Sequence, residues 1–73
     1  MALQDIVRMA NQIAGFFAAY PHDTAVQETA THIRSFWDPR MRQQLFDHLA
    51  KGGEGLQPIA LEASRSLLEK SLI

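Results

Sequence analysis

The sequence contains no cysteine, no long apolar run and no excess of charge of either sign. The absence of cysteine from all 73 residues excludes disulfide bonds, thiolate metal ligands and cysteine nucleophiles. No segment approaches the roughly 18 apolar residues of a membrane-spanning helix. Gln4 and Asp5 stand where a signal peptide has a basic start and an apolar core. We therefore expect a cytoplasmic protein that is neither exported nor inserted into a membrane.

The charge balance is close to neutral. Seven Lys and Arg residues against eight Asp and Glu residues leave a formal net charge of −1. This balance provides no overall field that attracts nucleic acid or anionic lipid. The hydrophobic fraction of 47% is too high for a disordered chain. A chain of this length forms one domain and buries only about 60% of its unfolded surface, so a partner can complete its thin core.

Apolar residues recur at helical spacing in four stretches, which prolines separate. In the first stretch they follow the i, i+3, i+4, i+7 rule, at Ile6, Met9, Ala10, Ile13, Phe17 and Tyr20. Proline cannot continue a helix but suits its first position, and it occurs at Pro21, Pro39 and Pro58. The pattern predicts helices over residues 3–19, 23–37, 39–50 and 58–70. The expected fold is all-α, a small bundle of about four short helices forming a single domain over residues 1–73, without disulfides.

The stretch from Phe36 to Arg42, FWDPRMR, predicts a corner between two helices. Asp38 directly before Pro39 has the position and chemistry of an N-cap, because its carboxylate can accept hydrogen bonds from free backbone N–H groups. The residue before a proline avoids the helical conformation, so the preceding helix should end here. Trp37 is expected in or over the core, with an interface role as the alternative. Arg34 and Asp38 are spaced i, i+4 and predict a local ion pair.

Two helix faces predict contact with another molecule. The far side of the first helix carries small or short residues, and Gly15 in mid-helix costs about 1 kcal/mol relative to alanine. That cost makes sense if another backbone comes close, and a tolerated surface glycine is the alternative. The fourth helix has two apolar lines, and it exposes apolar surface unless it is covered on two sides or is a frayed tail. The lines are Ile59, Ala63 and Leu67, and Leu61, Leu68 and Leu72.

No arrangement for catalysis or cofactor binding can be recognised. Gly52-Gly53 follows a helix and lacks the GK[ST] ending of a phosphate loop, so it predicts a left-handed helix cap. His22, His32 and His48 form no H-x-x-x-H pair, and no carboxylate pair or Ser/His/Asp grouping stands out. We therefore predict no catalytic, cofactor-binding or metal-binding residue in this chain, and no enzymatic activity by itself.

Three arginines, Arg34, Arg40 and Arg42, gather near Trp37. A helix-turn-helix contact with DNA is one interpretation of this cluster, and a solvated charged face is another. The negative net charge and the nearby Asp38 favour a protein partner, because arginine suits bidentate contacts with carboxylates. We then expect Arg40→Ala and Arg42→Ala to weaken the complex and to leave the helical signal intact. The candidate partner interface comprises Gly15, Arg34, Phe36, Trp37, Arg40, Met41, Arg42, Leu61 and Leu68.

Several strings together carry a family resemblance. They are Met9-Ala10-Asn11-Gln12-Ile13, Phe16-Phe17, His32-Ile33-Arg34, the FWDPRMR string from Phe36 to Arg42, Gly52-Gly53, Gly55-Leu56 and Pro58. In this respect the chain resembles the small delta subunit of NAD-dependent formate dehydrogenases. The resemblance covers roughly Met9 to Ala63, and the FWDPRMR string is its most specific part.

The resemblance implies a non-catalytic accessory subunit of a cytoplasmic, multi-subunit enzyme that oxidises formate to carbon dioxide and reduces NAD. It implies that the molybdenum or tungsten pterin, the iron–sulfur clusters and the flavin (FMN) belong to the larger subunits. The delta chain would hold no cofactor and would support assembly or stability of the cofactor-bearing large subunit. Two alternatives stay open: an assembly chaperone that leaves the finished enzyme, and a small helix-turn-helix DNA-binding protein.

Overall fold

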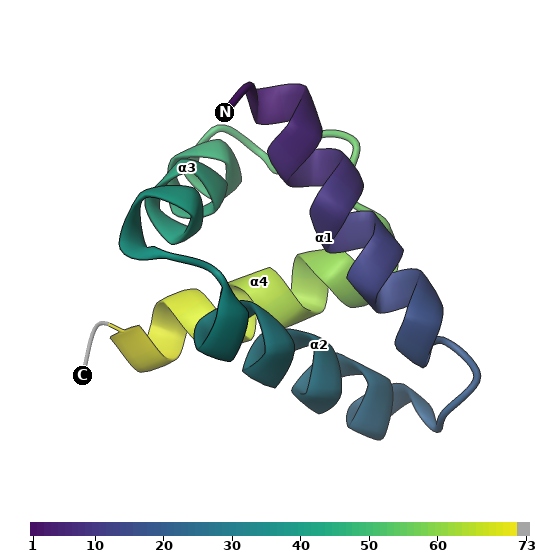
Figure 1. Ribbon diagram of the computed structural model, residues 1–73. Helices are drawn as coiled ribbons and strands as arrows, with labels where there is room; N and C mark the ends of the chain where they lie inside the picture. The colour runs from purple at the N-terminus through teal and green to yellow at the C-terminus, as the bar shows by residue number, and fades with distance from the viewer. Residues whose placement is uncertain (72–73) are drawn as a thin grey trace.

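A computed structural model describes residues 1–71, and these fold into four helices. They are α1 (Leu3–Phe17), α2 (His22–Phe36), α3 (Pro39–Ala50) and α4 (Pro58–Ser71). No strand occurs within residues 1–71, which confirms the predicted all-α class. In Figure 1, α1 and α3 form the upper half of the molecule, and α2 and α4 run along its lower half. The helices α1 and α4 each pack against all the others.

The core lies where the four helices meet, and small residues allow them to approach closely. Its buried members are Ile6, Ala10, Ala14, Ile33, Trp37, Leu45, Ala60 and Leu67. Trp37 is only 5% exposed, which confirms the prediction that it lies in the core. Two buried hydroxyls, those of Thr29 and Ser64, each donate to the carbonyl oxygen four residues earlier at 2.7 Å. These bonds satisfy the polar groups inside the core.

The corner between α2 and α3 forms as the sequence predicts. Trp37 has extended backbone angles, and α3 begins with Pro39 at its first position. The Asp38 carboxylate accepts a hydrogen bond from the Met41 N–H at 3.0 Å, which confirms its capping role. The predicted ion pair between Arg34 and Asp38 is wrong. The two ion pairs found within residues 1–71 join Arg8 to Asp5 and His22 to Glu62. The extended Trp37 breaks the helix between the two residues, so the i, i+4 geometry does not arise.

Glycines end α3 in the predicted left-handed cap. Gly52 and Gly53 have φ angles of 112° and 68°. The Gly53 N–H donates to the His48 carbonyl oxygen and the Gly52 N–H to the Leu49 carbonyl oxygen, each at 3.0 Å. This pair of bonds is the Schellman arrangement, which satisfies carbonyls that the helix end leaves free. A Cβ atom at Gly53 would lie 2.9 Å from Cδ1 of Leu61, so this position also needs the space that glycine leaves.

Asn11 attaches the loop between α3 and α4 to α1. Its side-chain nitrogen donates to the Gly55 carbonyl oxygen at 2.9 Å, and its oxygen accepts from the Gln57 N–H at 2.8 Å. Nε2 of His48 donates to the Glu54 carbonyl oxygen at 2.7 Å from the other side of the loop. Both side chains therefore hold the loop that leads into α4. None of the helices described is long and apolar enough to cross a membrane.

Candidate partner interface

The Arg42 side chain holds the corner between α2 and α3 together and is not free on its surface. Its Nη1 donates to the carbonyl oxygens of Arg34, at 3.0 Å, and Trp37, at 2.8 Å. These carbonyls lie at the C-terminal end of α2, where a positive charge also complements the helix dipole. Arg42→Ala would remove both bonds and so weaken the corner itself, whereas the expectation that it weakens the complex and leaves the helical signal intact stays a prediction.

Arg34 and Arg40 differ from Arg42 in that both side chains are exposed. Arg34 contributes its backbone carbonyl to the Arg42 contact, and its side chain stands outside the core. The corner therefore presents two exposed arginines and one that is tied to the backbone. Of the predicted arginine contacts, Arg40 is the one in α3 that a partner can reach without disturbing the corner.

Of the two aromatic residues of the corner, one side chain faces solvent and the other faces the core. Phe36, the last residue of α2, is 74% exposed, and Trp37 is buried. The Phe36 ring lies against the His32 ring one turn earlier, with centroids 4.6 Å apart. Because Trp37 is inside the core, Phe36 is the aromatic side chain that this corner offers to another molecule. Met41 is half-buried and packs against the core.

The surroundings of Gly15 within this chain are open. Gly15 is exposed, and a Cβ atom built on it meets nothing within 4 Å. No backbone segment of residues 1–71 therefore explains the glycine. It lines a shallow hollow with Ala14 and Ala18, opposite Pro58 and Ile59 at the start of α4. Its role at a partner interface stays a prediction.

Leu61 and Leu68 on α4 are half-buried. The helix packs against α1, α2 and α3, which supplies the cover on more than one side that its two apolar lines require. Leu61 in addition lies close to Gly53 in the loop before α4. Leu72, the third member of the second line, lies outside the described residues.

Two exposed aromatic residues were not among the predicted interface residues. Phe16 is 74% exposed and Tyr20 is 53% exposed. The helical pattern placed Tyr20 on the core stripe, which is wrong because α1 ends at Phe17 and Tyr20 lies in the turn that follows. The sequence signal for Phe16 is the Phe16-Phe17 pair, since adjacent helical residues cannot both face one narrow core stripe.

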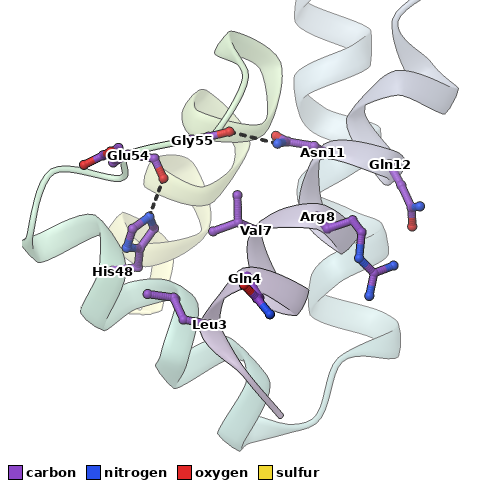
Figure 2. Close-up of a pocket in the computed structure, with 9 residues that line it drawn as sticks. All are labelled: Leu3, Gln4, Val7, Arg8, Asn11, Gln12, His48, Glu54 and Gly55. Atoms are coloured by element: carbon purple, nitrogen blue, oxygen red, sulfur yellow. Dashed lines mark hydrogen bonds between the residues drawn. The ribbon is translucent and has the colours of Figure 1, made fainter.

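A surface hollow lies between α1 and the loop before α4. It measures about 730 Å³ and is open to solvent. Figure 2 shows Asn11 and His48 directed at the backbone of this loop, with Val7 between them. Arg8 on its rim pairs with Asp5 at 3.0 Å. The polar groups here thus hold the loop against α1, and no group of three His, Asp or Glu side chains within residues 1–71 is placed to hold a metal ion.

The structure is that of a small all-α protein in which four polar side chains bind helix ends and the loop before α4, namely Asn11, Asp38, Arg42 and His48. The family model for the NADH-dependent formate dehydrogenase delta subunit, FdsD, matches residues 5–64. Because the match covers most of the chain, this protein belongs to the formate dehydrogenase delta subunit family. The match also confirms the resemblance drawn from the strings between Met9 and Ala63. No curated protein and no solved structure gives a significant match.

Proposed function

We propose that this chain is a non-catalytic accessory subunit of an NAD-dependent formate dehydrogenase. The observation that carries the proposal is the family match over residues 5–64, since a delta subunit implies other subunits. We assign to it support of the assembly or stability of the large, cofactor-bearing subunit in the cytoplasm. The molybdenum or tungsten pterin, iron–sulfur clusters and FMN belong to the partner subunits in this proposal.

The use of the polar side chains supports a structural role. Asp38 and Arg42 hold the corner between α2 and α3, and Asn11 and His48 hold the loop before α4. Their engagement with the backbone fits a rigid module that presents a fixed surface.

The exposed corner supplies contacts of the kind that protein interfaces favour. Phe36 and Arg40 are both exposed, and aromatic residues and arginine are enriched where proteins bind one another. Arg40 suits a carboxylate of the large subunit. The neutral overall charge gives little general attraction, so affinity in this proposal comes from shape and local contacts.

The proposal can be tested by producing the formate dehydrogenase of the source cell with and without this chain. With a tag on this chain, we expect the large subunit to co-purify, and its pterin metal content to fall when the chain is absent. An assembly chaperone would instead be recovered with the immature large subunit and be missing from the mature enzyme. Full metal content and formate oxidation without the chain, together with failure to co-purify at any stage, would refute the proposal.

A further inference from the structure

Five ring-bearing side chains from α1, α2 and the turn between them form one continuous surface, the aromatic face. Its members are Phe16, Phe17, Tyr20, His32 and Phe36. The Phe17 ring lies 5.0 Å from the Phe16 ring, edge to face, and 6.0 Å from the Tyr20 ring, measured between centroids. On α2 the His32 and Phe36 rings are in contact. Because Phe16, Phe17 and His32 line one shared hollow, the two sets of rings are joined.

The aromatic face leaves a large share of the chain's aromatic surface in contact with solvent. Four of the six Phe, Tyr and Trp residues belong to it. Phe16, Tyr20 and Phe36 are each more than half exposed. An aromatic side chain presents about 150–250 Å², so these three leave roughly 400 Å² uncovered. Patches of this size on small proteins are commonly binding sites.

The centre of the face contains no acidic side chain, lysine or arginine. The hollow in its middle is lined by Gln12, Ile13, Phe16, Phe17 and His32, and none of these is Asp, Glu, Lys or Arg. A partner group placed over this hollow loses contact with water, and an unpaired charge there would be costly. A surface that is apolar at its centre, with charged side chains only towards its edge, therefore suits this hollow best.

The area of the exposed rings bears on which partner covers them. Two chains joined symmetrically through the three exposed rings alone would bury roughly 800 Å² in total, whereas stable interfaces bury about 1,200 Å² or more. The rings by themselves are therefore too small for a stable pair of chains, and a partner must add contacts beyond them. Membership of a subunit family favours a larger formate dehydrogenase subunit as that partner.

We propose that the aromatic face is the surface through which this chain binds the formate dehydrogenase subunit that it accompanies. The occupant is an apolar strip of that subunit without charged side chains at its centre. This inference rests on the proposed accessory function. The main contact then lies on the joint surface of α1 and α2 and not on the corner alone. Phe16 and Phe36 are the two most exposed rings of this surface.

The test measures binding of the full chain to purified formate dehydrogenase prepared without it. Phe16 and Phe36 are each changed to alanine and to glutamine, which both suit a helix and leave the core untouched. The matched control is Leu3→Ala. It removes an exposed apolar side chain of α1 that lies away from the aromatic face, in the hollow beside the loop before α4. We expect the Phe variants to bind about 10-fold to 30-fold more weakly and Leu3→Ala to bind within about twofold of the unchanged chain.

The outcomes separate this inference from the function on which it rests. If the unchanged chain fails to bind the enzyme, both are refuted. If it binds and the four Phe variants, shown by circular dichroism to be folded, bind equally well, only the aromatic face is refuted. An equal loss with Leu3→Ala would overturn the assignment to this face. Sedimentation of the free chain as a dimer that Phe16→Gln abolishes, with enzyme binding unchanged, would assign the face to a second copy and overturn the proposal.

Discussion

Replacing Arg42 by alanine tests whether this side chain acts as part of the fold. The substitution removes two hydrogen bonds from Nη1, one to the Trp37 carbonyl in partly buried surroundings and one to the exposed Arg34 carbonyl. Hydrogen bonds to charged groups contribute about 1.5–3 kcal/mol each when buried, and considerably less when exposed to water. Adding a small loss of charge complementarity at the C-terminus of α2, we expect a total cost of about 2 kcal/mol.

This cost is large for a protein of 73 residues. Small domains have about 0.05–0.15 kcal/mol of stability per residue, which corresponds to roughly 4–11 kcal/mol here. Urea unfolding followed by far-ultraviolet circular dichroism measures the change. In thermal unfolding, each kcal/mol lowers the melting temperature of such a domain by about 4–8 °C, so Arg42→Ala should lower it by roughly 8–16 °C.

Two controls make the test specific. Arg42→Lys keeps the positive charge but lacks the planar guanidinium, so we expect it to recover about 0.5–1 kcal/mol at most. Arg40→Ala, at an exposed neighbouring site, should change the free energy of unfolding by less than about 0.5 kcal/mol. A free energy of unfolding for Arg42→Ala within about 0.5 kcal/mol of that of the unchanged protein would refute the assigned role.

Three further substitutions test single features of the fold. Asp38→Ala removes the N-cap of α3 and should cost about 1 kcal/mol, and an unaltered melting temperature would reject the capping role. Gly53→Ala forces a side chain into left-handed backbone and against Leu61, so it should lower the urea midpoint by the equivalent of about 2 kcal/mol. Gly15→Ala meets open space in mid-helix and should stabilise the free chain by about 0.5–1 kcal/mol. A stabilised Gly15→Ala chain that also binds formate dehydrogenase more weakly would show that a partner backbone uses the glycine, whereas unchanged binding would assign it to free surface.

The four helices and both ends of α3 could be derived from local sequence because local chemistry sets them. Proline has no N–H and a fixed φ, so Pro39 begins α3, and Asp38 before it can cap only the helix that follows. In the same way, only glycine adopts the angles found at Gly52 and Gly53 without strain. The family resemblance rests on these same strings, and it too was recognisable without coordinates.

The direction of individual side chains could not be derived in this way. The helical pattern predicted Trp37 in the core but left an interface role open, and only the packing shows that Trp37 is buried while Phe36 is exposed. Arg40 and Arg42 likewise appeared equivalent, yet only Arg42 is close to the carbonyls of α2. The aromatic face was not predicted, because Phe16 and His32 are 16 positions apart and meet only when α1 packs on α2.

The sequence by itself determined the four helices, the caps of α3 and the family, since each depends on residues within a few positions of one another. The tertiary structure alone decided which side chains remain for a partner. Which side chains remain exposed depends on the turn between α2 and α3 and on the packing of α1 against α2. Together these bury Trp37, bring Arg42 to the carbonyls of α2 and leave Phe16 and Phe36 exposed. Exposure is a property of the whole packed chain, because a side chain is covered by residues that are distant in sequence.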